Sequence, residues 1–296
     1  MRVTETTRYG SMLAALQGSN TKLGETQERI ASGRRLQRYS DGPVDAANAL
    51  YLRAEEEDLA SYAKAADDAL GWLTTQDGAL QSASSIMQRV RELTISAGNA
   101  SNGPQERETI ATELEGLRDQ LLTLVNTKYV GRSVFGGFAD TAVENVLGVW
   151  TWQGDGGQIN RRIGADVTVQ ANIDGQTVFG FNGAPGTDVF SLLDKIAADV
   201  RAGDQPATSA DLTEIETRTN GLLNGLAVVG ARSNLIESVT GDAEARTSTL
   251  KLQRSTLEDV DIAQAALELA QAESGYKATL AAASRLQLPT LIDFLR

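Results

Sequence analysis

Two segments contain residue types that could bind an ion or a ligand. One is a glycine-rich string with an acid, and the other is a run of acidic residues. Residues 154–157 read Gly-Asp-Gly-Gly, a composition that also occurs in phosphate-binding and calcium-binding loops. The string lacks the lysine and the strand-to-helix context of a phosphate loop, so we interpret it as a plain turn. Residues 55–58 read Glu-Glu-Glu-Asp. Adjacent residues of a helix do not share a face, so we expect a solvated first helical turn here rather than a cation site.

The composition removes most catalytic chemistry. The chain has 296 residues with no cysteine and no histidine, which excludes thiol nucleophiles, disulfides, imidazole bases and nearly all zinc sites. We therefore predict a protein that is not an enzyme, with no catalytic residue, no cofactor and no metal. The formal net charge is -12, and repulsion from phosphate argues against nucleic acid as a partner.

One basic cluster stands out against this acidic background. Arg34, Arg35 and Arg38 follow Lys22 and Arg29 closely in the sequence. Two interpretations stay open for this cluster: a solvated loop, which we favour, and a contact with an acidic partner surface.

The elements that must position these residues are helices, and the clearest lie at the two ends of the chain. Each end carries a narrow apolar stripe with alternating steps of four and three residues, the spacing of a coiled coil. The first stripe consists of Met12, Leu16, Ser19, Leu23, Thr26 and Ile30. The second consists of Ile262, Ala266, Leu269, Glu273, Tyr276, Leu280 and Ala283. A narrow stripe needs a partner helix to be stable, so the two ends look like partners.

Further helices are expected inside the chain. The pattern predicts a long helix over 45–99 and another that begins at Pro104, a residue suited to a first helical turn. A third region repeats apolar residues every seven positions, which indicates a long helix in a bundle. These residues are Leu222, Val229, Ile236, Ala243, Leu250 and Leu257.

Between these helices, residues 131–205 change to an alternating pattern typical of strands. We predict one hairpin that joins 149–153 to 158–163 through the Gly-Asp-Gly-Gly string, and a second that turns at Asp174 and Gly175. A short helix follows an N-cap at Thr187 or Asp188. Trp150 and Trp152 share one strand face, and we favour a core position for both over a carbohydrate platform.

These patterns together predict a mainly α fold. It has a terminal coiled coil, a bundle of long helices and an inserted small β-rich domain. No segment reaches the roughly 18 apolar residues that span a membrane, and the first residues lack the apolar core of a signal peptide. The sequence thus predicts no membrane partner.

Several motifs resemble the flagellin superfamily. Residues 30–36 (Ile-Ala-Ser-Gly-Arg-Arg-Leu) and 39–50 (Tyr-Ser-Asp-Gly-Pro-Val-Asp-Ala-Ala-Asn-Ala-Leu) resemble its N-terminal signature, in a form closer to hook-associated members than to filament flagellin. Residues 230–237 and 257–263 are similar to its C-terminal Gly-Ala-Arg and Glu-Asp-x-Asp elements, and 291–295 resembles the closing segment of hook-associated members. The resemblance covers about 1–140 and 205–296.

Two departures from the family pattern are visible. Gly42 stands where many relatives have Asp, so a role of that acid in the turn is in doubt. Pro289 and Thr290 replace the usual Leu-Ser.

The resemblance also implies a division into three domains. Residues 1–42 and 258–296 would form an inner coiled coil, residues 43–135 and 205–257 a helical bundle, and residues 136–204 the outer inserted domain.

The resemblance implies a structural protein of the bacterial flagellum, an adaptor at the hook–filament junction; the alternative is a filament flagellin. Its partners would be copies of itself in a ring, a neighbouring hook-associated protein, flagellin and a flagellar export chaperone. The protein would be extracellular, exported by the flagellar type III apparatus without a cleaved signal peptide. The expected assembly interface consists of Met12, Leu16, Leu23, Ile30, Ile262, Leu269, Tyr276, Leu280, Leu291, Ile292, Phe294 and Leu295.

Overall fold

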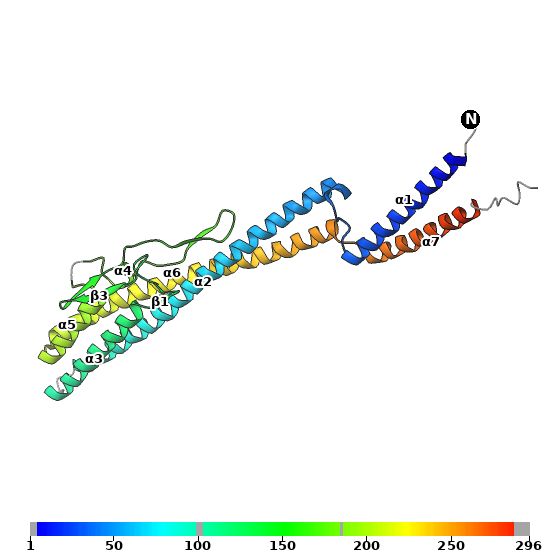
Figure 1. Cartoon of the computed structure of the whole chain (residues 1–296). Helices are drawn as coiled ribbons and strands as arrows, with labels where there is room; N and C mark the ends of the chain where they lie inside the picture. Colours follow the sequence, from blue (N-terminus) through cyan, green and yellow to red (C-terminus); the bar gives the residue numbers. More distant parts are fainter. Residues whose placement is uncertain (1–4, 99–102, 184–185, 287–296) are drawn as a thin grey trace, which may run out of the picture. The chain divides into compact units, whose positions relative to one another are not determined.

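The computed structural model describes residues 5–98, 103–183 and 186–286, and this part of the chain is mainly helical (Figure 1). The long helices are α1 (Glu5–Ser32), α2 (Pro43–Ala97), α3 (Pro104–Val125), α5 (Val189–Ala202), α6 (Gln205–Glu258) and α7 (Ile262–Leu286). A 3-10 turn, η1 (Tyr39–Asp41), and a one-turn helix, α4 (Gly175–Val178), complete the helical elements. The predicted class, long helices with a small β-rich insertion, is confirmed.

Local sequence signals explain where several helices begin and end. Pro104 opens α3, and the N–H of Gly103 donates to Glu106 at 2.6 Å. Asp188, one of the two predicted N-caps, accepts from the N–H groups of Phe190 and Ser191 at the start of α5. Gly203 ends α5 in the left-handed conformation (φ 71°), which glycine adopts without steric cost.

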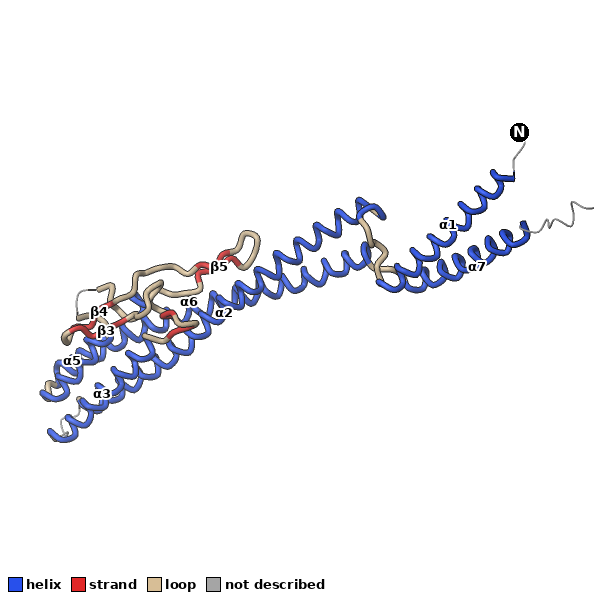
Figure 2. Tube along the Cα trace, viewed as in Figure 1, coloured by secondary structure: helices blue, strands red, loops and turns tan. Residues whose placement is uncertain are grey.

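The strands form three separate antiparallel pairs (Figure 2). They are β1 (Lys128–Tyr129) with β2 (Arg132–Ser133), β3 (Val143–Val146) with β4 (Val149–Trp152), and β5 (Asn160–Arg162) with β6 (Thr168–Gln170).

Both predicted hairpins are wrong in their pairing. Residues 149–152 pair with the preceding strand through a tight turn at Leu147 and Gly148, a turn that the sequence hides because leucine rarely adopts the φ of 54° seen here. The second prediction fails because the Asp174 side chain accepts from the N–H of Gln176 at 3.1 Å and so caps α4 instead of turning a hairpin.

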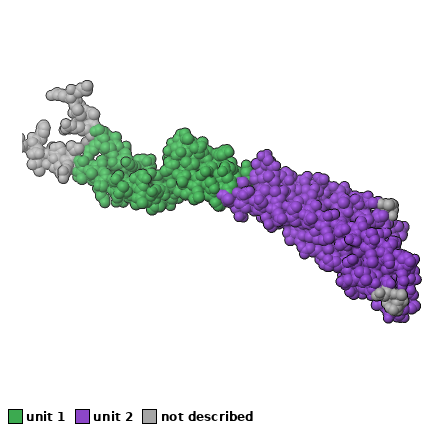
Figure 3. Space-filling view, turned by 180° about the vertical axis from the view of Figure 1, so that it is seen from behind, with its two compact units in different colours: residues 1–58, 246–296 green, residues 59–245 purple. Residues whose placement is uncertain are grey.

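By contact density the chain divides into two units, residues 1–58 with 246–296 and residues 59–245 (Figure 3). The three-domain division expected from the sequence stays a prediction.

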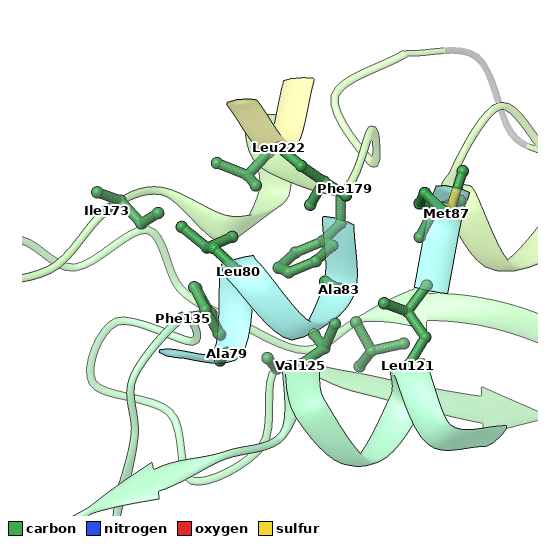
Figure 4. Close-up of a cluster of buried hydrophobic side chains, with 14 of the residues drawn as sticks. Ala79, Leu80, Ala83, Met87, Leu121, Val125, Phe135, Ile173, Phe179 and Leu222 are labelled. Atoms are coloured by element: carbon green, nitrogen blue, oxygen red, sulfur yellow. The ribbon is translucent and has the colours of Figure 1, made fainter. Parts of the chain in front are cut away.

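The large core lies in unit 2. Side chains from α2, α3, α5, α6 and the insertion meet there with almost no exposure (Figure 4). Leu80, Met87 and Leu121 are fully buried, and Phe135 packs edge-on against Phe179 with ring centroids 5.2 Å apart.

The insertion is fixed to the helices of unit 2 by polar and aromatic contacts. Trp150 stacks near Phe190 at 5.0 Å and donates its Nε1–H to Asp194 at 2.7 Å, so its predicted core position is confirmed. Arg232 of α6 donates to the carbonyls of Asn172 (2.6 Å) and Gln170 (3.2 Å). Burial lowers the pKa of Arg232, yet these carbonyls satisfy its guanidinium.

The β1–β2 segment packs closely against α2 at Gly71. A Cβ at this position would overlap the Tyr129 ring, which packs beside Trp72 at 5.4 Å. A Cβ at Gly78, in the same helix, meets nothing within 4 Å.

Alanine is favoured over glycine inside a helix by about 0.5–1 kcal/mol. We therefore expect Gly78→Ala to raise the free energy of unfolding and Gly71→Ala to lower it, measured by urea denaturation. Equal effects of both substitutions would contradict this packing.

Candidate functional site

The terminal helices α1 and α7 lie side by side as an antiparallel pair in unit 1 (Figure 1). The hydroxyls of Ser19 and Thr279 are 3.3 Å apart, and Arg29 forms an ion pair with Glu268 at 2.9 Å. On α1, the seam residues are the predicted stripe: Thr26 is buried, and Met12, Leu16, Ser19, Leu23 and Ile30 are half-buried. The predicted partnership of the two ends is thus present within one chain.

The seam on α7 is displaced from the predicted stripe. Ala265 and Ala272 are its buried residues, and Leu269, Tyr276 and Ala283 are half-buried beside them. Ile262, Ala266 and Leu280, which we predicted within the stripe, are exposed. The start of α7 is apolar around most of its circumference, so periodicity could not select the face. The small alanines allow the two helix backbones to approach closely.

The pair leaves large apolar side chains in solvent. Leu13 is 56% exposed, Ile262 57%, Leu267 62% and Leu280 48%. Ile262 and Leu280 therefore belong to the outward surface of the pair, whereas Leu269 and Tyr276 belong to its seam. The four remaining interface residues predicted from sequence, Leu291, Ile292, Phe294 and Leu295, lie outside the described residues.

The loop before α2 docks on the segment between α6 and α7. The N–H of Arg35 donates to the carbonyl of Glu258 at 2.6 Å, and the N–H of Val260 donates to that of Gly33 at 3.0 Å. The Arg35 guanidinium also donates to the Leu257 carbonyl (2.6 Å) and to Asp45 (2.8 Å). Arg34, Arg35 and Arg38 are exposed, as expected of a solvated loop, and Arg35 also has partners within its own chain.

Asp41 closes a tight turn in this loop. Its carboxylate accepts from the N–H groups of Arg38 (2.9 Å) and Gln37 (3.3 Å). These bonds, that of Arg38 first, lower the pKa of Asp41 below its ordinary value of 3.8. The turn gains stability from the ionised form at higher pH and loses it as the pH falls through the lowered pKa. This acid directly precedes Gly42, so the turn keeps an acid although position 42 is glycine.

A buried carboxylate holds the docked segment. Glu258 is 6% exposed and lies 2.8 Å from Arg53 and 3.3 Å from Arg254. A charge removed from water needs such partners, because an uncompensated buried charge is strongly destabilising.

The acidic run at 55–58 also differs from its prediction. It lies inside α2 rather than in a first turn, and Glu55 and Glu56 form ion pairs with Arg246 (2.8 Å) and Arg254 (3.1 Å) of α6. The hydrogen bond that Arg254 donates to Glu56 is the main reason that the pKa of Arg254 is raised. Only Glu57 and Asp58 are solvated, because the register of the helix pair turns the first two acids toward α6.

The Gly-Asp-Gly-Gly string is a loop closed by its own acid. The Asp155 carboxylate accepts from the N–H groups of Phe138 and Gly157, both at 2.9 Å, and these bonds lower its pKa. The Gly157 N–H that would face a phosphate is thus already used. Across the described ranges, no group of three or more Asp and Glu side chains is placed to hold a metal ion, and no helix is long and apolar enough to cross a membrane.

Sequence comparisons place these features in a known family. Residues 4–140 match the family model of the bacterial flagellin N-terminal helical region. The chain is 24% identical to flagellar hook-associated protein 3 of Salmonella typhimurium over 302 residues. The aligned region covers 94% of this chain and 95% of that protein.

Residues 4–140 of this chain therefore carry the N-terminal helical region of bacterial flagellins. The chain is also 26% identical to the flagellin of Bacillus subtilis, over 89% of each chain. Among solved structures, a flagellar hook-associated protein from Vibrio parahaemolyticus matches with a TM-score of 0.69 and 22% identity, covering 74% of this chain and 100% of that one. The flagellar junction protein of Legionella pneumophila matches with a TM-score of 0.59 and 17% identity, covering 71% and 99%. These structures show the flagellin-like fold of the chain.

The buried carboxylate generates a prediction about the docked loop. Glu258→Gln keeps the shape but removes the charge that faces Arg53 and Arg254. Hydrogen bonds to charged groups contribute about 1.5–3 kcal/mol, and each 1.4 kcal/mol corresponds to about a tenfold change in an equilibrium constant. We expect amide hydrogen exchange over 33–42 and 258–262 to quicken by about tenfold or more.

Glu55→Gln is the matched control for this experiment. Its partner Arg246 is half exposed, and exposed ion pairs contribute about 0.2–1 kcal/mol, so exchange should change by less than about fivefold. An equal response to both substitutions would show that Glu258 does not hold the loop.

Proposed function

We propose that this chain is a structural subunit at the hook–filament junction of the bacterial flagellum. The observation that carries the proposal is the match to flagellar hook-associated protein 3 along almost the whole of both chains. The motifs of residues 30–50 resemble the hook-associated form, and residues 257–263, on which the loop docks, resemble an element of the superfamily in general. Its partners would be copies of itself in a ring, a neighbouring hook-associated protein, flagellin and an export chaperone, and it would reach the cell exterior through the flagellar type III apparatus.

The assembly surface would be the terminal helix pair. The α1–α7 seam is only half-buried, and the outward side chains of Ile262, Leu267 and Leu280 remain in solvent. Apolar area of this kind gains about 25 cal/mol per Å² when a neighbouring copy covers it. A pair that is incomplete as a monomer and complete in a tube of copies would account for the exposed residues.

A second candidate is a filament flagellin. It is favoured by the 26% identity to the Bacillus subtilis flagellin over 89% of each chain. The two functions predict different phenotypes for a strain in which the gene is deleted. Deleting the gene of a junction protein should leave hooks without filaments and release flagellin into the medium, whereas deleting a filament flagellin should remove flagellin altogether. Electron microscopy of the deletion strain and analysis of its medium decide between them; normal filaments on the deletion strain would refute both.

The terminal pair generates a prediction that separates assembly from folding. Ile262→Ala with Leu280→Ala truncates two exposed side chains, so we expect the thermal unfolding of the purified monomer to be unchanged. Each side chain buried on assembly contributes about 1.5–3 kcal/mol, so filament attachment and motility should be lost.

Leu121→Ala serves as the control in the core of unit 2. This leucine is fully buried, so truncation should lower the stability of the monomer by about 2–5 kcal/mol. If the terminal double variant lowered the melting temperature as much as Leu121→Ala, the exposed residues would be part of the monomer fold and the assembly role would fail.

A further inference from the structure

The region of unit 2 where α5 leads into α6 contains a carboxylate that is closed off from water. Asp211 of α6 is 0% exposed. Its Oδ1 accepts from the Nζ of Lys195 in α5 at 2.8 Å. Its Oδ2 is also buried but has no hydrogen-bond partner among the described residues. The Lys195 side chain is 47% exposed, and its cation compensates the lost hydration on only one side of the carboxylate.

A second carboxylate oxygen without a partner lies on the facing helix. The Oδ2 of Asp199 is buried and has no hydrogen-bond partner in the part of the chain that the structure describes. Asp199 follows Lys195 by four residues in α5, so both side chains lie on one face of that helix. Because Lys195 reaches Asp211, this face is turned toward α6. Two unpaired acceptor oxygens therefore lie on adjoining faces of α5 and α6.

Charged groups on both helices act on Asp211. Burial is the largest cause of its pKa shift and raises the pKa above the ordinary value of 3.8. The hydrogen bond and the charge of Lys195 lower this pKa, whereas the negative charges of Asp199 and Glu214 raise it. The net direction is upward, so the carboxyl group takes up a proton more readily in the folded chain than in water.

The charged groups of the other helices near this region have different contacts. Arg107 of α3 lies against Gly203, the residue after α5, and Arg201 forms ion pairs with two acids of α3. The buried residues at the end of α2 are uncharged: Val90, Leu93, Thr94 and Ala97. Lys195 is the cation that the described structure places against Asp211.

We propose that Asp211 and Asp199 hold one proton between them. The proton comes from solvent and binds the Oδ2 of Asp211, which then donates a hydrogen bond to the Oδ2 of Asp199. One proton thus converts two unpaired acceptors into a donor and an acceptor, and it removes one of two like charges. The bond from Lys195 to Oδ1 is retained. A carboxyl pair of this kind titrates as a unit.

The shared proton gives α5 two attachments with opposite responses to pH. On the α3 side, Arg201 donates to Glu115 at 2.6 Å, and hydrogen bonding to Arg201 is the main cause that lowers the pKa of Glu115. Stability from a lowered pKa is lost as the pH falls through it, whereas stability from a raised pKa is lost as the pH rises through it. Charge therefore holds α5 to α3 at neutral pH, and the shared proton holds α5 to α6 more firmly in acid. The inference concerns the single subunit and goes beyond the proposed junction function.

Asp211→Asn tests the direction of the effect, because its amide donates a hydrogen bond without taking up a proton. Urea denaturation of the purified full-length monomers is compared between about pH 7 and about pH 4, a range that lies above the ordinary carboxyl pKa of aspartate. The native chain should gain stability relative to Asp211→Asn as the pH falls. The gain should reach up to about tenfold in the folding equilibrium constant for each pH unit over which the proton binds.

An ordinary ion pair between Lys195 and Asp211 predicts the opposite sign. Its carboxylate would lose the bond on protonation, so the native chain would lose stability relative to Asp211→Asn as the pH falls. That result would overturn the proposal, and so would a difference between the two chains that does not change with pH.

Asp199→Asn and Glu214→Gln separate a shared proton from a general effect of negative charge. Asp199→Asn offers an amide N–H to the Oδ2 of Asp211, so the pH dependence, measured against the same chain with Asp211→Asn, should be largely lost. Glu214→Gln is the matched control: this acid also raises the pKa of Asp211, but its side chain is 54% exposed, so the pH dependence should remain. Equal loss in both variants, or full pH dependence in Asp199→Asn, would contradict a shared proton.

Carbon NMR of chains labelled at the aspartate carboxyl groups gives a measurement that does not depend on unfolding. One carboxyl signal of the native monomer should titrate at higher pH than the other aspartates, and this signal should be missing in Asp211→Asn. A titration in which every aspartate responds at or below its ordinary pKa would refute the shared proton. All these measurements use the monomer, so their outcome is independent of the phenotype of the deletion strain that tests the junction function.

Discussion

A helix with one narrow apolar stripe cannot bury it alone, and this constraint governs the whole chain. In unit 2 the stripes of α2, α3 and α6 meet one another, α5 and the insertion, and Leu80, Leu121 and Leu222 become almost fully buried. In unit 1 the helices meet only in pairs. A pair of helices buries one seam and leaves the other sides exposed to solvent. The stripe of α1 therefore remains largely half-buried. In the proposed assembly, neighbouring copies would supply to unit 1 the burial that several layers supply within unit 2.

Where apolar contacts are sparse, polar contacts determine register. The α2–α6 segment of unit 1 is aligned by Arg53, Arg254 and Arg246 with their acidic partners, and the loop before α2 is held by Arg35 on the carbonyls of Leu257 and Glu258. Exposed ion pairs contribute little free energy. A shift in helix register would nevertheless leave the buried Glu258 carboxylate without its arginine partners, and an unpaired buried charge is strongly destabilising. The polar residues therefore specify the geometry that the apolar seams only stabilise.

The helices could be predicted from sequence because their signals are local and long. Six heptad positions from Leu222 to Leu257 and the caps at Pro104 and Asp188 define their elements without tertiary information. The insertion could not be predicted in the same way. Its strands are two to four residues long, and Leu147 turns a hairpin with a backbone angle that sequence rules assign to Asn or Gly. Likewise, the face of α7 was hidden because alanine is compatible with both a close seam and solvent. Only the partner helix distinguishes Ala265, which is buried, from Ala266, which is exposed.

This distribution of contacts separates folding from assembly. The main buried cluster lies in unit 2, where losing one buried leucine would cost a large part of the stability of a domain. The half-exposed seams of unit 1 leave apolar area that contacts between copies would cover in the proposed assembly. With the proposed junction function, a subunit would travel as a single chain and then join a polymer, which requires both properties in different parts of its length. The chain achieves this with one kind of element, because a heptad stripe is a core when other helices surround it and an interface when only one does.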